Sequence, residues 1–164
     1  MGDCSMSGST PILVVGYDRS APSRRALVLA VELATRLNAR LHVVHVVDLR
    51  DYPIDPDSAD WEQQGRERLA AEFEAVKSTL TGWIGDWSYD VQRGDPARVL
   101  TGAAENDHAM MIIVGTRAES GIGAQLERLL GVSGSVSHVL RHATVPVLVV
   151  PDDRGHTHRG NADP

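Results

Sequence analysis

The stretch Ile112-Ile113-Val114-Gly115-Thr116-Arg117 decides the fold, because an apolar run there stops at a glycine. Such an uninterrupted run is typical of a parallel strand buried on both faces. A second run lies near the start of the chain, Ile12-Leu13-Val14-Val15-Gly16-Tyr17-Asp18, and ends at a glycine and a carboxylate. Two strand ends of this kind at the carboxyl edge of one parallel sheet would form a crevice of nucleotide size.

The remaining strands and helices follow from the spacing of apolar residues. Apolar runs predict strands at Ile12–Val15, Leu41–Val47, Met110–Val114 and Val145–Val150, and the alternation of Trp87, Tyr89 and Val91 with polar residues predicts an edge strand. Helical spacing predicts a helix from Ser20 to Asn38, a stripe from Leu69 to Trp83, a helix opening at Asp95-Pro96 and a short one from Gly134 to Arg141. This alternation predicts an α/β sandwich around a mostly parallel sheet, with helices on both faces.

Composition narrows the class of protein. The chain has 164 residues, 42% of them hydrophobic, which predicts a single domain with a real core. We expect a flexible tail over residues 1–10, the domain over 11–151 and a disordered tail over 152–164. The net charge of −6 argues against a general nucleic-acid or anionic-membrane surface. No apolar stretch approaches the roughly 20 residues of a membrane span, and the polar N-terminus predicts a cytoplasmic protein.

Several kinds of site are disfavoured by the sequence. Cys4 is the only cysteine, which excludes an intrachain disulfide and a cysteine-based zinc site. Lys77 is the only lysine and lies in a helical pattern, so no Walker-type phosphate loop is present. His138 and His142 share a helix face but lack the glutamate of the metalloprotease motif and a third ligand. We therefore expect no metal site and no catalytic residue.

Five short segments, in order, resemble the universal stress protein family. The segments are Gly16-Tyr17-Asp18-Arg19-Ser20, similar to that family's V-D-G-S turn, Leu41–Val47, Gly94-Asp95-Pro96-Ala97, Val114-Gly115-Thr116-Arg117, and Gly134-Ser135-Val136-Ser137 with the residues up to Val150. The resemblance covers about Pro11 to Pro151. Together with the strand and helix pattern, it implies a Rossmann-like, doubly wound sheet of five strands in the order 3-2-1-4-5.

The resemblance also implies a binding site for ATP, or a related adenine nucleotide, at the carboxyl edge of the sheet. The residues that it places there are Gly16, Asp18, Val46, Val114, Gly115, Arg117, Gly134 and Ser135. Structural roles compete with these assignments. Asp18 suits a turn that caps the first helix, Val46 suits a buried strand, the glycines suit turns, and Ser135 suits a helix cap.

The nucleotide motif of the family is only partly present. That motif has glycine, two residues, glycine, nine residues, glycine, and then serine or threonine. Gly115 matches the first glycine, but Ala118 stands at the second, and fifteen residues rather than nine precede Gly134-Ser135. A methyl group at position 118 can hinder close approach of the backbone to a phosphate, whereas Arg117 and Arg128 can supply other phosphate contacts.

Three functions remain open from the sequence. The first is a regulatory, non-enzymatic module that binds an adenine nucleotide. The second is a stress protein that binds no nucleotide and acts as a dimeric scaffold for another protein, which Ala118 and the long segment after it favour. The third is a slow nucleotide hydrolase, which the lack of a recognisable base, metal cluster or P-loop lysine disfavours. In the first two readings we expect a homodimer through the apolar last strand, Val145–Val150.

Overall fold

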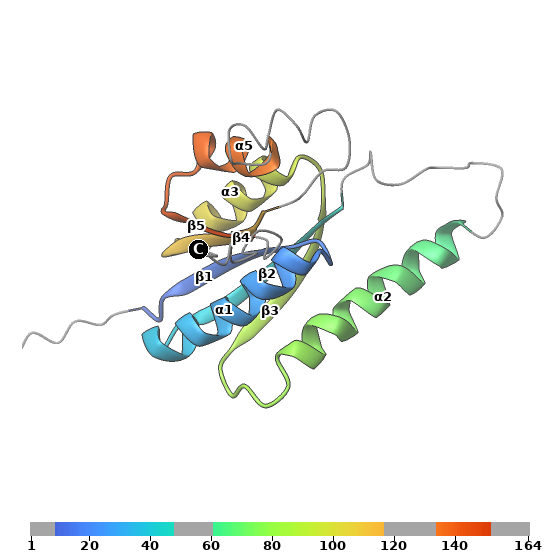
Figure 1. Cartoon of the computed structure of the whole chain (residues 1–164), viewed down its shortest axis with the longest axis horizontal. Coiled ribbons are helices and arrows are strands. Elements are labelled where there is room, and N and C mark those ends of the chain that lie inside the picture. The colour runs from blue at the N-terminus through green and yellow to red at the C-terminus, as the bar shows by residue number, and fades with distance from the viewer. Residues whose placement is uncertain (1–8, 48–60, 117–133, 152–164) are drawn as a thin grey trace, which may run out of the picture.

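The fold is a five-stranded parallel sheet, and the described part of the chain places two helices on each of its faces (Figure 1). A computed structural model of the chain describes residues 9–47, 61–116 and 134–151. Within them the elements, in chain order, are β1 (Ile12–Tyr17), α1 (Ala21–Leu37), β2 (Arg40–Val47), α2 (Trp61–Thr79), β3 (Trp87–Arg93), α3 (Pro96–Asn106), β4 (Met111–Gly115), α5 (Gly134–His142) and β5 (Val147–Val150). The strand order is β3-β2-β1-β4-β5 and every pairing is parallel, which confirms the predicted topology.

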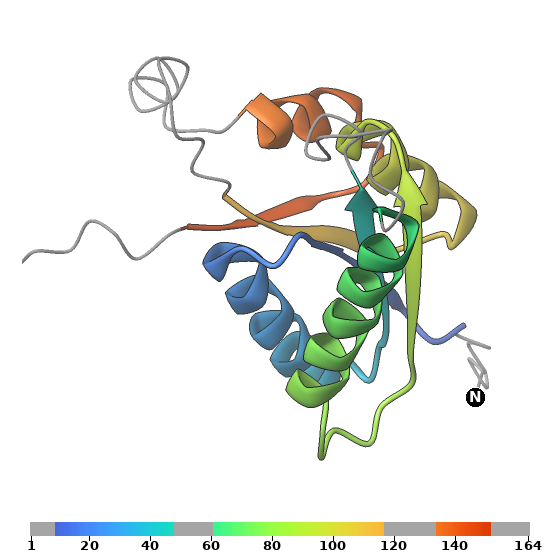
Figure 2. The ribbon, with the colours of Figure 1, turned by 90° about the vertical axis from the view of Figure 1, so that its right-hand side faces the viewer.

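Alternate residues of the strands build two cores, one on each face of the sheet. Leu13, Val15 and Ile113 are fully buried on the face that α1 and α2 cover. Val14 and Ile112 are fully buried on the other face, under α3 and α5. The two helical layers are visible on opposite sides of the sheet in Figures 1 and 2. Burial of both faces explains why the central strands read as continuous apolar runs.

The predicted helix caps form as expected. Ser20 is the N-cap of α1, and its side chain accepts a hydrogen bond from the backbone N–H of Ser23. Asn38 ends α1 in the left-handed conformation, with φ of 50°. Asp95 caps α3 in the same way as Ser20 caps α1, by accepting from the N–H of Arg98.

Several element boundaries differ from the predictions, among them the end of α2 and the start of β5. The apolar stripe predicted to reach Trp83 belongs to a helix that ends at Thr79, and Gly82 follows in a turn with φ of 86°. Trp83 still packs against the core beyond the helix, and its Nε1–H donates to Thr35 on α1 over 3.0 Å. The last strand begins at Val147 rather than Val145. The residue before it, Pro146, accepts a hydrogen bond from the N–H of Ile112 through its carbonyl.

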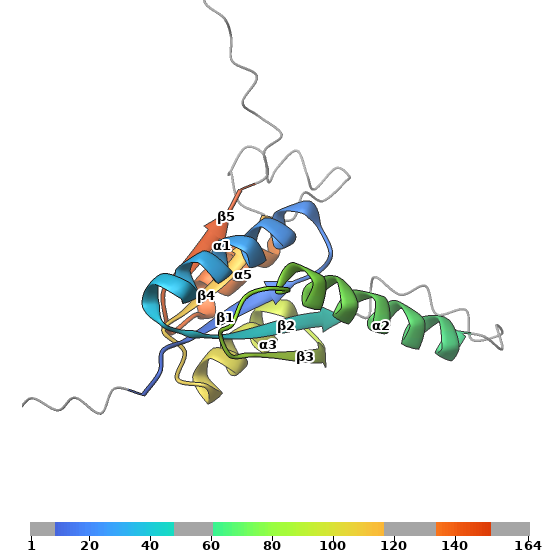
Figure 3. The same ribbon diagram turned by 90° about the horizontal axis from the view of Figure 1, so that it is seen from below.

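Helix α2 is the least embedded of the helices. Among its side chains from Gln63 onward, Glu72 and Val76 are buried, and Leu80 is buried just beyond the helix end. Residues 63–68 are largely exposed. The first half of α2 runs on past the ends of β2 and β3, as the views in Figures 1 and 3 agree. Among residues 9–47, 61–116 and 134–151, no helix has both the length and the apolar character needed to cross a membrane.

Candidate functional site

The candidate site lies at the carboxyl edge of the sheet, where β1 and β4 are neighbours. The chain leaves β1 into α1 on one face, whereas the helix that follows β4 in the described residues, α5, lies on the other face. Parallel sheets bind ligands where neighbouring connections diverge in this way. The first turns of α1 and α5 lie on the same side of the molecule as the ends of β4 and β5 (Figure 2).

Three of the predicted site residues share one face of this edge. Val46 and Val114 both pack against the core under α3 and α5. Gly16 points to the same side, because a Cβ placed on it would meet Leu100 at 3.0 Å and Val114 at 3.2 Å. The structure therefore brings Gly16, Val46 and Val114 together. It also gives each a packing role, since Val114 is 6% exposed and Gly16 has little room for a side chain.

Gly115 faces the opposite side of the sheet, toward the first turn of α1. A Cβ on Gly115 would lie 2.5 Å from the backbone nitrogen of Ser23 and 2.6 Å from the carbonyl oxygen of Pro22. Backbone atoms cannot yield as the tip of a side chain can, so only glycine fits between β4 and α1 at this position. This close approach is a sufficient reason for the glycine, independent of any phosphate.

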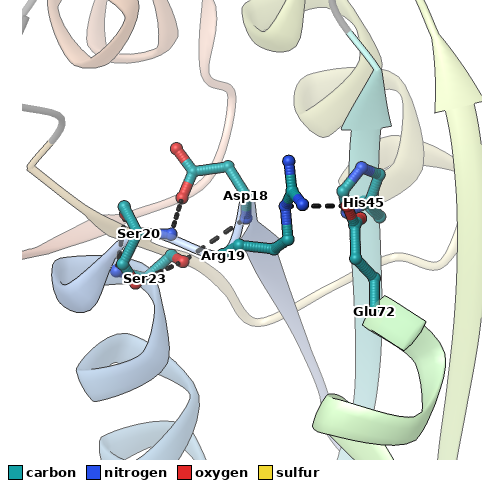
Figure 4. A network of polar contacts seen from close by, with 6 residues as sticks. All are labelled: Asp18, Arg19, Ser20, Ser23, His45 and Glu72. Atoms are coloured by element: carbon teal, nitrogen blue, oxygen red, sulfur yellow. Dashed lines mark hydrogen bonds and ion pairs between the residues drawn. The ribbon is translucent and has the colours of Figure 1, made fainter. Parts of the chain in front are cut away.

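Asp18 forms the turn between β1 and α1. Its Oδ1 accepts a hydrogen bond from the N–H of Ser20 over 3.0 Å, and its own N–H donates to Ser23 Oγ over 3.4 Å (Figure 4). The predicted turn role is therefore present in the structure. Asp18 is only partly buried and stays at the sheet edge beside Val46, one step beyond the paired residues Tyr17 and His45.

The other three predicted site residues are described less fully or not at all. Arg117 lies outside the described residues, as do Ala118 and Arg128. Gly134 and Ser135 form the start of α5, as predicted, and their side chains are outside the description. The start of α5 lies at the carboxyl edge, because α5 runs back across the sheet before β5.

A buried polar cluster at this edge was not predicted from the sequence. We call it the Glu72 network, and it consists of Arg19, His45 and Glu72 (Figure 4). Arg19 Nε lies 2.7 Å from Glu72 Oε1, and His45 Nδ1 lies 2.7 Å from Glu72 Oε2. The Glu72 side chain is 2% exposed, whereas that of Arg19 is 57% exposed. The network thus joins the turn after β1, the end of β2 and α2.

Burial dominates the electrostatics of the Glu72 network. It raises the pKa of Glu72, an effect that Arg19 and Arg68 partly offset and Asp18 reinforces. Burial also lowers the pKa of His45, and the positive charge of Arg19 adds to this effect. Both shifts favour the neutral forms of Glu72 and His45. Tyr17, whose ring lies beside that of His45, has a pKa raised mainly by burial.

The Glu72 network left one indication in the sequence. Glu72 falls between Leu69 and Val76 at helical spacing, so a carboxylate occupies the buried stripe of α2. Buried carboxylates are normally paired or hydrogen-bonded, so the position of Glu72 was a signal that could have indicated a partner. The partner could not be identified from the sequence, because the pairing depends on how α2 crosses the ends of β1 and β2.

Three other described histidines, His42, His138 and His142, do not belong to the Glu72 network. His42 lies on the opposite face of β2 from His45, and its two ring nitrogens face Asp107, just past the end of α3, and Asp90 on β3. The rings of His138 and His142 lie 5.0 Å apart on α5. In the part of the chain that the structure describes, no three His, Cys, Asp or Glu residues are grouped so that they could hold a metal ion.

Sequence comparison agrees with this architecture. Residues 10–151 match the sequence model of the Universal stress protein family. The chain belongs to the universal stress protein family. A relative, universal stress protein MJ0531 of Methanocaldococcus jannaschii, is 30% identical over 146 residues, which cover 84% of this chain and 80% of the relative.

Solved structures of this family share the fold. The hypothetical protein MJ0577 superposes with a TM-score of 0.71 at 19% identity, over 88% of this chain and 97% of that one. A universal stress protein solved in complex with cAMP superposes with a TM-score of 0.60 at 23% identity, over 88% of this chain and 98% of that one. These likenesses support the Rossmann-like assignment of the sheet.

Proposed function

We propose that this universal stress protein is a regulatory module that binds ATP or a related adenine nucleotide in the cytoplasm and is not an enzyme. The observation that carries the proposal is the gathering of three strand ends, those of β1, β2 and β4, at a switch point of the parallel sheet. The cAMP complex of a protein with the same fold supports an adenine nucleotide as the ligand class.

In this proposal the base and ribose lie near Asp18 and Val46, over the ends of β1 and β2. The phosphates lie near Gly115 and the start of α5, where Gly134, Ser135 and Arg117 contribute. Unpaired backbone N–H groups at the first turn of a helix, with the positive end of its dipole, favour phosphate oxygens. Gly16 and Val114 form the floor between these two regions.

Melting temperature with and without nucleotide tests the proposal. A ligand that binds only the native state stabilises it by RT ln(1 + [L]/Kd), which is about 2.7 kcal/mol at a hundredfold excess over Kd. Millimolar ATP should therefore raise the melting temperature clearly if Kd is in the range of tens of micromolar. Chromatography of small molecules released on denaturing the fresh protein tests for a nucleotide carried through purification.

Site variants separate binding from general stability. Asp18→Ala and Gly134→Val should each reduce the shift caused by ATP, and Ala118→Gly, which restores the glycine of the family motif, should enlarge it. Asp86→Ala is the matched control, because Asp86 is 81% exposed and lies at the amino end of β3. No shift with ATP in the wild type and in Ala118→Gly, together with flat titration calorimetry, would contradict the proposal.

A second function is favoured by the packing of the two glycines. The backbone of α1 requires a glycine at 115, and the side chains of Leu100 and Val114 crowd Gly16, so packing accounts for both glycines without a phosphate. With Ala118 in the motif, this supports a stress protein that binds no nucleotide and serves as a dimeric scaffold for a protein partner. In both readings we propose a homodimer through β5, which pairs with β4 alone among the described strands. Hydrolysis of ATP that is observed with the folded protein and lost when it is unfolded would favour the third function, a slow nucleotide hydrolase.

A further inference from the structure

Two histidines meet on the exposed side of α5. His138 and His142 are four positions apart, a separation that places both side chains on one face of a helix. Their ring centroids lie 5.0 Å apart, so the two imidazoles meet in the folded protein. Both residues are exposed, His138 with 56% of its side chain open to solvent. The pair therefore lies outside the cores and is accessible to a ligand from solution.

The part of α5 that carries the pair is held against the core. Val139, which follows His138, is 2% exposed and packs in the core under α3 and α5. Its carbonyl accepts a hydrogen bond from the N–H of Ala143 over 2.8 Å, which closes the turn that contains His142. A binding site is more precise when its side chains stand on a rigid element. The backbone therefore keeps the two histidines at a fixed separation.

Asp95 lies beside one ring nitrogen of His138. Its Oδ2 is 3.9 Å from Nδ1, too far for a direct hydrogen bond, but close enough to leave Nε2 as the nitrogen directed away from the carboxylate. Asp95 is itself held in place as the N-cap of α3. Metal-binding histidines commonly present one nitrogen to the metal and the other to a carboxylate or to water. His138 has this arrangement, with Nε2 as the available ligand.

The pair has the chemistry of a transition-metal chelate. Imidazole nitrogen suits Zn²⁺, Ni²⁺ and Cu²⁺, whereas Mg²⁺ and Ca²⁺ prefer oxygen ligands. Arg141, which lies between the two histidines in the sequence, is exposed and positively charged. A general attraction of cations therefore does not account for a site here, and binding has to come from coordination by the two ring nitrogens.

The sequence led us to expect no metal site, because a third protein ligand was lacking. The described residues likewise contain no group of three His, Cys, Asp or Glu residues suited to a metal ion. An open site does not need a complete set of protein ligands, since water occupies the remaining positions. Such a site binds its metal more weakly than a closed one.

We propose that His138 and His142 chelate a divalent ion such as Zn²⁺ or Ni²⁺, and that Asp95 acts as a positioning residue for His138. The metal joins two consecutive turns of α5, so its binding free energy also stabilises that helix. Contact between the two rings alone confers no affinity for a metal. The start of α5 belongs to the carboxyl edge of the sheet, but the metal site does not depend on a nucleotide there.

Titration calorimetry of the full-length chain without nucleotide tests the site, with Ni²⁺, Zn²⁺ and Mg²⁺ as probes. Cys4, His156 and His158 lie outside the described residues and carry ligand groups for the same ions. All site variants are therefore made in a background that combines Cys4→Ser, His156→Asn and His158→Asn. Metal binding in this background cannot come from those three side chains.

Within the background, His138→Gln and His142→Gln each remove one ligand. His108→Asn is the matched control, because His108 is also exposed and has φ of 49°, which asparagine tolerates. Asp95→Asn removes the carboxylate charge and keeps a good N-cap for α3. Hydrogen exchange over residues 138–143 reports on α5 itself.

The background protein should bind Ni²⁺ and Zn²⁺ and should not bind Mg²⁺. His138→Gln and His142→Gln should each weaken Ni²⁺ binding by about tenfold or more, and Asp95→Asn should weaken it by a smaller factor. His108→Asn should bind Ni²⁺ as the background does. Ni²⁺ should slow exchange over residues 138–143 in the background and leave it unchanged in His142→Gln.

Two results would overturn the metal site. The first is a background protein that binds neither Ni²⁺ nor Zn²⁺, and the second is Ni²⁺ binding that His142→Gln leaves unchanged. Equal Ni²⁺ affinities of Asp95→Asn and the background would overturn the positioning role of Asp95. Because no nucleotide is present, none of these outcomes bears on the proposed nucleotide function.

Discussion

At the scale of single residues, Gly115 is the position where packing and ligand binding make competing claims. We expect Gly115→Ala to destabilise the protein by about 1–3 kcal/mol, because its Cβ would press on backbone atoms of Pro22 and Ser23. Urea unfolding of the ligand-free protein measures this. Weaker ATP binding by this variant would then not by itself identify a phosphate contact.

Gly102 provides the control for this substitution. It lies inside α3, and a Cβ on it would meet nothing within 4 Å. Gly102→Ala should therefore stabilise the protein by about 0.5–1 kcal/mol, since alanine loses less conformational freedom in a helix. Equal stability of the two variants would contradict the packing role assigned to Gly115.

The Glu72 network predicts a specific pH dependence of stability. The pKa of Glu72 is raised above 4.5. Its contribution to the free energy of unfolding is therefore complete below pH 4.5 and is lost as the pH rises through the raised pKa. The pKa of His45 is lowered below 6.5. Its contribution to the free energy of unfolding is therefore present above pH 6.5 and is lost as the pH falls through the lowered pKa. Between pH 4.5 and 6.5 the two effects oppose each other.

Glu72→Gln removes one of these two opposing effects. The free energy of unfolding should then rise more steeply with pH between 4.5 and 6.5 than it does in the wild type. Urea titrations at several pH values measure the slope, with Glu74→Gln as the exposed control. A slope in Glu72→Gln that equals the wild-type slope would show that Glu72 does not titrate in this range.

Single residues were also the hardest scale to predict from the sequence. The turn role of Asp18 followed from its place between an apolar run and a helix cap. Gly115 could be placed at a strand end, but the approach of α1 to it depends on packing across the sheet. The same holds for Glu72, whose partners come from segments 53 and 27 positions away, at Arg19 and His45.

At the scale of elements, the packing of α2 on the sheet should depend mainly on the buried side chains at its C-terminal end. Leu80 is 3% exposed just beyond the helix, whereas Leu69 on the projecting half is only partly buried. We expect Leu80→Ala to cost about 2–5 kcal/mol, as buried leucines do, and Leu69→Ala to cost clearly less. Thermal or urea unfolding measures both. A larger cost for Leu69→Ala would mean that the projecting half is packed more firmly than its exposure indicates.

The elements themselves were largely predictable, and their ends were not. The apolar runs of the central strands and the caps at Ser20, Asn38 and Asp95 confirm that local patterns determine where these elements form. The stripe of α2 continued to Trp83 in the sequence, yet the helix stops at Thr79. An apolar side chain keeps its place in the core after a helix has ended, so periodicity alone cannot locate the last turn.

At the scale of the whole molecule, the strand order was predictable because parallel strands with intervening helices permit few arrangements, and the resemblance to universal stress proteins selects one of them. The proposed dimer depends instead on the outer edge of β5, beside which no other described strand lies. The carbonyl of Pro146 accepts a hydrogen bond from the N–H of Ile112 in β4. The carbonyl of Val150 accepts one from the N–H of Thr116, which directly follows β4. Backbone groups of alternate residues point the same way in a strand, so those of Val147 and Val149 point away from β4.

This geometry gives a test of the proposed dimer that leaves the sheet intact. Val149→Pro removes an outward N–H and no hydrogen bond to β4, and proline is tolerated on edge strands in this orientation. If two copies pair through β5, this variant should run as a folded 17.7 kDa monomer in light scattering, whereas the wild type has twice that mass. Val149→Ala keeps the N–H and should remain dimeric. A wild type that is monomeric at high concentration, or a Val149→Pro dimer, would contradict pairing through this edge. In the second case the contact must involve side chains of another surface, because the backbone of β5 could no longer supply it.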